Sequence, residues 1–208
     1  MKIQVLGVLA GTLTIAGCGS LLESELPAGQ AYVLRPPAHE APAATTHAGS
    51  VLLQRPEAGP GLESDRIVLL RSDRRFDFYA ASRWAAPAPD MLESVMVDGL
   101  RASGAFAAVF DDSAPYAPRY NLRCGMRRFE ADYTKGGHAP TVFVALDCTL
   151  GRHRDRELLA SFTAQGSAMA GDDRLNAVVA AFDTATATAV AELTRQAAAA
   201  VANEPATP

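Results

Sequence analysis

Residues 120–150 read YNLRCGMRRFEADYTKGGHAPTVFVALDCTL, and this stretch decides the fold. Apolar side chains take every second position from Tyr120 to Met126, and they do so again from Val142 to Leu150. This period of two is the pattern of a half-buried β-strand. The sequence Lys135-Gly136-Gly137-His138 lies between the two runs and is typical of a turn. The stretch therefore predicts a β-hairpin with one apolar face.

One register of this hairpin places every inward apolar side chain opposite another. The opposed pairs are then Leu122 with Leu150, Cys124 with Cys148, and Met126 with Leu146. A slip by one residue would turn one apolar set to the wrong face. Opposed Cα atoms in a non-hydrogen-bonded pair lie about 4.5 Å apart, near the short end of disulfide geometry. We therefore expect a disulfide between Cys124 and Cys148; the alternative is two buried free thiols acting as small hydrophobes.

The chain on either side of the hairpin contains further strands and two helices. Short apolar runs predict strands at 31–34, 50–55, 66–70, 76–79, 107–110 and 157–165. An amphipathic helix is expected to begin near Pro89 and to stop at Gly104. A longer one runs from Arg174 to about Ala200, with Asp172 or Asp173 as its N-cap. This order predicts an α+β fold, a mostly antiparallel sheet with two main helices packed on one face.

The N-terminus, MKIQVLGVLAGTLTIAGCGS, predicts export and lipid anchoring. After Lys2 no charge occurs through Gly17, and this run is too short to span a bilayer stably, as in a secretory signal peptide. It ends in Ile15-Ala16-Gly17-Cys18, which resembles a bacterial lipobox; the alternative is an ordinary signal peptide with an incidental cysteine. Lipidation makes Cys18 the first mature residue, and several acyl chains anchor a protein stably. Gly19, in place of an aspartate, favours the outer membrane, on its periplasmic face.

These features divide the chain into four parts. We expect a signal peptide over 1–17, a tether over 18–30, a single domain over 31–201 and a disordered tail over 202–208. Beyond the signal peptide, no apolar run is expected to cross a membrane. With Cys18 acylated, Cys124 and Cys148 remain as an even pair in an oxidising compartment.

Composition and motifs exclude several classes of function. The mature chain has 18 basic and 23 acidic residues, a net charge of −5, so it has no electrostatic footprint for nucleic acid. No hydrolase, metalloprotease or phosphate-loop motif occurs, and we assign no catalytic residue, no metal site and no cofactor. Four histidines lie in predicted loops without a ligand partner at helical spacing, and we interpret them as solvated. They are His39, His47, His138 and His153.

Three other features have both a structural and a functional interpretation. The pair Asp111-Asp112 suits a solvated turn better than a metal site. Arg123, Arg127 and Arg128, together with the charged turn 152–156, form either a solvated hairpin face or a basic patch for lipid headgroups or an acidic partner. Trp84, the only tryptophan, is expected to fill the core at a helix entrance.

Several segments in a fixed order resemble the ABC-type transport auxiliary lipoprotein family, the PqiC-like proteins. The matching segments are Tyr32-Val33-Leu34, Arg66-Ile67, Tyr79 with Arg83-Trp84, Pro87 to Leu92, Leu100 to Phe106 with Val109, Tyr120-x-Leu122 with Phe129, and Ala181-Phe182 with Ala185. No single segment is specific to this family, but the order of the segments after a lipobox is.

This resemblance implies a structural or docking subunit of an MCE-type system that carries lipids between the inner and outer membranes. The implied partners are an MCE-type protein and ABC permease components. Whether the chain also forms a homo-oligomer is left open by the sequence. The family implies no chemistry of its own and no catalytic residues. The alternatives are a stand-alone periplasmic lipoprotein that binds a small apolar ligand, and a hydrolase with an unrecognised site.

The lipid anchor is directly testable. Replacement Cys18→Ala removes the only thiol at the lipobox, so the chain is expected to accumulate as a precursor without acyl groups. Metabolic labelling with a radioactive fatty acid measures this. Equal labelling of the variant and the natural chain would refute the assignment of Cys18.

Overall fold

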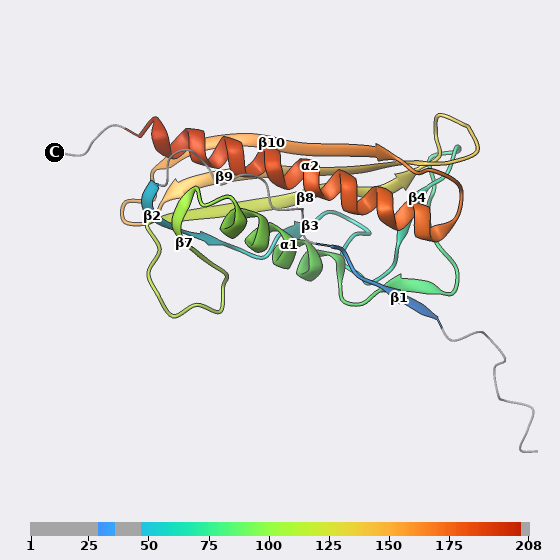
Figure 1. The fold of residues 1–208 in the computed structure, drawn as a ribbon, viewed down its shortest axis with the longest axis horizontal. Coiled ribbons are helices and arrows are strands. Elements are labelled where there is room, and N and C mark those ends of the chain that lie inside the picture. The colour runs from blue at the N-terminus through green and yellow to red at the C-terminus, as the bar shows by residue number, and fades with distance from the viewer. Residues whose placement is uncertain (1–28, 36–46, 205–208) are drawn as a thin grey trace, which may run out of the picture.

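The computed structural model describes residues 29–35 and 47–204, and its central feature is the hairpin of the 120–150 stretch (Figure 1). Strands β8 (Tyr120–Asp132) and β9 (Thr141–Arg152) pair in antiparallel fashion. The opposed pairs are Leu122 with Leu150, Cys124 with Cys148, and Met126 with Leu146. All six side chains are buried. The predicted register is therefore confirmed.

The sheet around this hairpin is mixed. Strand β10 (Leu158–Met169) pairs antiparallel with β9. On its other side β8 pairs in parallel with β2 (His47–Leu53), β3 (Glu57–Ala58) and β4 (Val68–Leu70). Strand β7 (Phe106–Phe110) runs parallel to β2, and β5 (Phe76–Phe78) is antiparallel to β4. The α+β class is confirmed, but the expected mostly antiparallel sheet holds only for β8–β10 and the β4–β5 hairpin. Strands β2, β3 and β4 pair in parallel with β8, and β2 pairs in parallel with β7, because long connections return the chain in the same direction.

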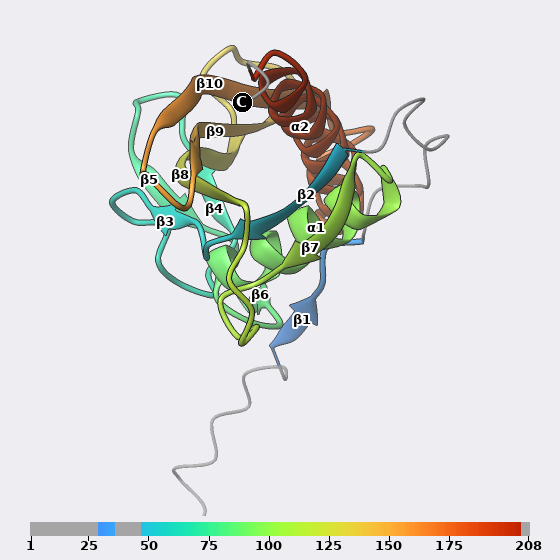
Figure 2. The ribbon, with the colours of Figure 1, turned by 90° about the vertical axis from the view of Figure 1, so that its left-hand side faces the viewer.

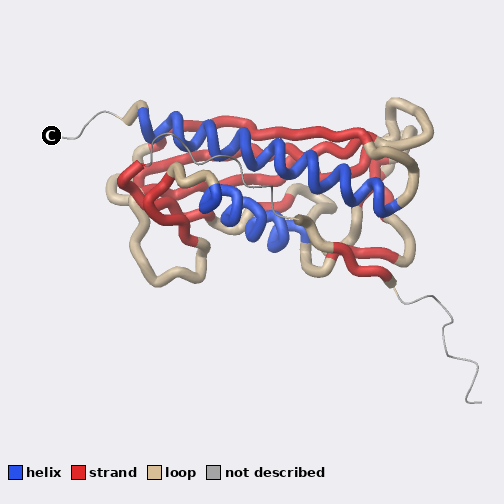
Figure 3. Tube along the Cα trace, in the orientation of Figure 1, coloured by secondary structure: helices blue, strands red, loops and turns tan. Residues whose placement is uncertain are grey.

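Two helices cover the sheet. Helix α1 (Ala88–Ala102) contacts β7 and α2, whereas α2 (Leu175–Ala202) packs along β10 and β9. Figures 2 and 3 show the curved sheet with both helices side by side along its open side. A separate two-stranded parallel sheet joins β1 (Gln30–Tyr32) to β6 (Ser82–Trp84). Neither β3 nor β6 was expected from the sequence.

Aromatic rings fill the space between the helices and the sheet. Trp84 has an exposed fraction of 1%. Its ring lies edge-on to Phe182 of α2, with centroids 5.1 Å apart, and 5.8 Å from Phe129 of β8. Such tilted contacts are favourable geometries for aromatic pairs. The prediction that Trp84 fills the core is confirmed.

A β-bulge halfway along β8 shifts the alternation of inward and outward side chains by one residue. Met126 pairs with Leu146 and Arg128 with Ala145, so Arg127 is an extra residue without a partner of its own. An extra residue shifts the inward positions by one. Phe129 and Ala131 are buried as a result, although they are out of phase with Tyr120 to Met126.

By length and composition α2 could cross a membrane, contrary to the expectation that no run after the signal peptide would qualify. Its apolar window is 56% buried within the described part of the protein. A core helix passes the same test because it too is apolar over much of its surface. In this fold α2 is such a core helix, packed on β9 and β10.

Glycine at position 166 allows α2 to approach β10. A Cβ atom there would lie 2.1 Å from the backbone oxygen of Ala185 and 2.9 Å from the backbone nitrogen of Ala189. We expect Gly166→Ala to lower the free energy of unfolding by about 1–3 kcal/mol, because the helix must shift. Denaturant unfolding measures the change. Gly171→Ala is the matched control, because no atom lies within 4 Å of its Cβ, and its stability should stay within about 0.5 kcal/mol. Equal stability of the two variants would contradict this packing.

Candidate functional site

The candidate anchor, Cys18, lies outside the described residues, which begin at Gly29. The backbone nitrogen of Gln30 donates to the carbonyl of Ala81 at 2.9 Å. The hydroxyl of Tyr32 donates to the side chain of Asn176, at the start of α2, at 3.1 Å. The chain that leads from the anchor therefore joins the domain at the N-terminal end of α2.

The sulfur atoms of Cys124 and Cys148 form a disulfide, with Cα atoms 4.1 Å apart. Both side chains are buried between the sheet and the helices. The bond crosslinks the two strands that hold the centre of the sheet. It has no access to solvent partners, which suits a structural bond rather than an exchanging one.

Three arginines of the predicted basic patch, Arg123, Arg127 and Arg128, each have an acidic partner. Arg123 lies 3.7 Å from Glu57 of β3, and Arg127 lies 3.7 Å from Asp147 of β9. The guanidinium of Arg128 contacts Glu130 at 2.6 Å and Asp132 at 2.9 Å. Burial raises the pKa of Glu130, and the charge of Arg128 opposes this rise. The face that carries Arg123, Arg127 and Arg128 is therefore a hairpin face of paired charges.

The charged turn 152–156 is tied down by a buried ion pair. Arg152 contacts Glu204 at 2.9 Å, Glu157 at 2.6 Å and Asp155 at 3.2 Å. The hydroxyl of Tyr120 donates to Glu204 at 2.6 Å. This hydrogen bond, with the nearby positive charges, lowers the pKa of the Glu204 carboxyl.

Glu204 corrects the expected disordered tail over 202–208 for residues 202–204 only. Helix α2 continues to Ala202, and the side chain of Glu204 is held by three others. The amide nitrogens of Asn203 and Glu204 donate to carbonyls of the last helical turn. Residues 205–208 lie outside the described part of the chain.

A polar groove of about 440 Å³ runs between α1 and the 111–113 loop. Its charged lining residues are Arg55, Asp90, Glu93, Asp98, Arg101, Asp111 and Asp112. Arg55 bonds Asp90, and it also bonds Glu63 at 2.6 Å. Burial, and then the negative charges of Asp112 and Asp111, raise the pKa of Glu93. Among residues 29–35 and 47–204, no three histidine, cysteine or acidic side chains are placed to hold a metal.

Asp111 acts locally within its own turn. Its carboxylate accepts hydrogen bonds from the amide nitrogen of Ser113 at 3.0 Å and from the Ser113 hydroxyl. These bonds lower the pKa of Asp111. The solvated-turn interpretation of Asp111-Asp112 therefore describes this segment.

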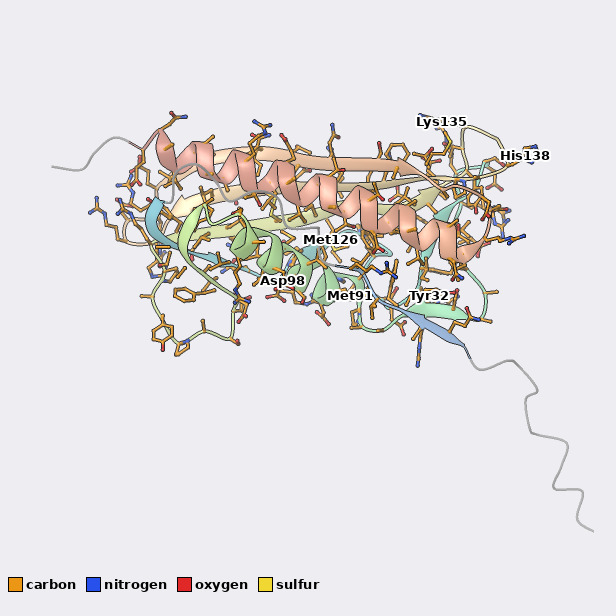
Figure 4. All side chains as sticks on the ribbon, viewed as in Figure 1. Tyr32, Met91, Asp98, Met126, Lys135 and His138 are labelled. Carbon is orange, nitrogen blue, oxygen red and sulfur yellow. A yellow bond between two sulfur atoms is a disulfide. The ribbon has the colours of Figure 1, made fainter. Side chains whose placement is uncertain are left out.

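The described histidines and the Asp172-Asp173 pair do not form a site. His138 lies in the β8–β9 loop (Figure 4), whereas the ring of His153 bonds Asn121 at 3.0 Å near the opposite end of β9. The side chains of His39 and His47 are outside the description. The predicted N-cap was wrong: Arg174 occupies that position without a side-chain bond, because Asp172 accepts from the Arg174 amide and Asp173 from Tyr133.

A chain of hydrogen-bonded hydroxyl groups lies at the end of the molecule that contains the β8–β9 loop and the start of α2. Tyr79 and Tyr133 share a hydrogen bond of 2.8 Å, and Tyr133 in turn donates to Asp173. Burial raises the pKa of Tyr79 to about 12. Both phenols therefore stay protonated at neutral pH and act as fixed links between β5, β8 and the start of α2.

Comparisons with known proteins identify one family and similar solved structures. The model of the ABC-type transport auxiliary lipoprotein component matches residues 32–198. A crystal structure of a protein from Xanthomonas campestris has 28% identity and a TM-score of 0.76, over 86% of this chain and 100% of that chain. A second solved structure, of an uncharacterised protein, has 16% identity and a TM-score of 0.63, over 82% of this chain and 99% of that one. No curated protein matches the sequence.

The disulfide has a measurable consequence. Mature protein purified without reductant is expected to show no alkylatable thiol at Cys124 or Cys148 by mass spectrometry. Reduction should lower the free energy of unfolding by up to about 3.5 kcal/mol, because the bond closes a loop of roughly 25 residues. The Cys124→Ser, Cys148→Ser double variant is the control, since reductant should not change its stability. Two alkylatable thiols in the natural chain would contradict the bond.

Proposed function

The chain belongs to the ABC-type transport auxiliary lipoprotein family, and on that premise we propose that it is a docking subunit of an MCE-type lipid transport system. In this proposal residues 1–17 are removed and Cys18 is acylated. The protein is then held on the periplasmic face of the outer membrane. It contacts an MCE-type protein, and through it the ABC permease components, and can assemble with further copies of itself. The family match over 32–198 is the observation that carries this proposal.

The arrangement of polar groups supports a docking role without turnover. The strongly held carboxylates bind arginines or backbone amides of the same chain, as Glu204, Asp111 and Asp132 do. A catalytic centre instead combines perturbed ionisable groups with a shaped cavity where a substrate can be held. Glu93 has a raised pKa, but its neighbours in the groove are other carboxylates and the paired Arg55. The Ser113 hydroxyl in this groove donates to Asp111, but the Ser113 amide nitrogen bonds the same carboxylate, so this contact closes the 111–113 turn.

The lining of this groove does not suit the apolar-ligand alternative. A site for an apolar molecule is lined mainly by aliphatic and aromatic side chains. Here Val97 is the single aliphatic residue among ten lining residues, and the others are charged or are serines. We therefore keep the transport role as the proposed function.

Co-purification from cross-linked envelopes tests the partners. The full-length chain, tagged at its C-terminus, is expected to recover an MCE-type protein and permease components identified by mass spectrometry. The Cys18→Ala variant is the control, because loss of the anchor should reduce this recovery strongly. Recovery of the chain alone from intact, cross-linked envelopes would overturn the proposed partners.

Absence of a chemical role predicts tolerance at the polar side chains. Replacements His138→Ala, His153→Ala and Asp111→Asn with Asp112→Asn should leave envelope function nearly unchanged, with stability within about 0.5–1 kcal/mol of the natural protein. Survival of the strain in detergent, beside that of a Cys18→Ala strain, measures this. A folded variant that fails like the Cys18→Ala strain would reveal a chemical site.

A further inference from the structure

Four chain segments meet at one end of the molecule, which we call the tether end. They are the start of β1 at Gln30, the β4–β5 turn (71–75), the β8–β9 loop (133–140) and the connection from β10 to α2 (170–174). The pairs Leu70–Asp132 and Met169–Thr141 place the turn, the loop and the end of β10 together. The bond between Tyr32 and Asn176 brings the start of the described chain to the same end. Figure 1 shows these segments on its right-hand side, and Figure 4 places Tyr32, Lys135 and His138 there.

The tether end presents apolar side chains beside unpaired cations. Phe76 has an exposed fraction of 55% and Met169 of 76%, both among the largest for apolar side chains in the described residues. Arg74, at the tip of the β4–β5 turn, and Lys135 have no ion pair with any described residue. Lys135 instead lies 5.8 Å from the ring centre of Phe143.

The other charges at this end largely cancel one another. Arg71 pairs with Asp77, and Arg75 pairs with Asp73 at 2.6 Å. Arg174 lies 3.9 Å from Asp172, and Asp173 accepts a hydrogen bond from Tyr133. Arg74 and Lys135 thus supply positive charge that neighbouring carboxylates do not bind directly. Exposed apolar side chains among basic ones are the composition of surfaces that lie at a membrane interface.

The length of the tether decides which end can reach the membrane. From Cys18 to Gly29 there are eleven residue steps, which span at most about 40 Å when fully extended. Helix α2, with 28 residues, is about 42 Å long and runs from the tether end to the opposite end. The opposite end would therefore reach the anchoring membrane only if the tether were stretched along the whole molecule.

We propose that the tether end rests on the lipid headgroups of the membrane that holds the acyl anchor. Arg74 and Lys135 contact headgroup phosphates, and Phe76 and Met169 lie at the boundary with the acyl chains. This inference rests on the proposed function, because it takes Cys18 as the anchor. The opposite end, with Leu158 and the 152–156 turn, then points into the periplasm and is available to a protein partner.

Headgroup quenching of tryptophan fluorescence tests this orientation. The acylated full chain is reconstituted in vesicles of phosphatidylethanolamine and phosphatidylglycerol that carry a nitroxide on some headgroups. Two variants are compared, Phe76→Trp at the tether end and Leu158→Trp at the opposite end; Leu158 is similarly exposed, at 61%. Trp84 is buried and common to both, so the natural chain gives the background. We expect emission from the Phe76→Trp variant to be quenched severalfold more strongly. Equal quenching, or stronger quenching at position 158, would overturn the proposal.

Charge reversal tests the role of the basic residues. Each basic side chain near an anionic surface changes membrane partitioning about fivefold. In the Phe76→Trp background, Arg74→Glu with Lys135→Glu should remove most of the quenching, whereas Arg154→Glu with Arg156→Glu at the opposite end should not change it. Unchanged quenching in the first pair would overturn the headgroup contact. The acylated mass is measured first: an unacylated chain contradicts the proposed anchor, while an acylated chain without preferential quenching contradicts this inference alone.

Discussion

The register between β8 and β9 is the constraint on which the rest of the fold depends. Strand β8 pairs with β9 on one side and with β2, β3 and β4 on the other, so its inward side chains form the floor of the core. A slip of one residue would expose Leu122 and Met126 and bury Arg123, which lies between them. The Cys124–Cys148 bond closes the pair at the only register that also opposes the flanking apolar residues. Hydrophobic pairing and the covalent link thus specify the same arrangement, and this agreement between levels favours a single folded state.

The sequence predicts the elements whose signals are local and misses those formed by partners. Alternation over β8 and β9 and the helical period of α2 are each repeated over many residues, so these elements were predictable with their register or face. Strands β3 and β6 have two and three residues, and each exists only because β8 or β1 lies beside it. The bulge at Arg127 left one trace in the sequence, since the apolar positions change phase between Met126 and Phe129. Parallel pairing leaves no such trace in the sequence of a strand. Parallel partners are joined by long connections, so their pairing depends on distant parts of the chain.

Prediction from the sequence is limited in the same way for the charged residues of the candidate site. A sequence counts arginines but does not show which carboxylates lie beside them, so Arg123, Arg127 and Arg128 could be read as a basic patch. In the fold each has an acidic partner from a neighbouring strand or its own strand. Exposed ion pairs of this kind contribute little to stability, but they cancel the local field that would attract an anionic partner. Conversely, Glu204 lies in the segment that was expected to be a tail, but its carboxylate binds the buried Arg152. The two residues are 52 positions apart in the chain, so no local pattern could reveal this contact.

A rigid domain on a tether can hold a partner at a fixed distance from a membrane without performing chemistry, and the fold suits that role. The long strands and α2 run from the tether end to the opposite end, so both ends belong to one packed unit with a shared core. The buried disulfide and the Arg152–Glu204 pair each join segments distant in sequence, and they limit independent motion of the two ends. Because the described chain begins next to the start of α2, an acyl anchor at Cys18, as proposed, would constrain this end of the domain far more than the other. In the proposed arrangement, the distance from the bilayer to a partner is set mainly by the length of the domain, which is the property that the proposed docking role requires.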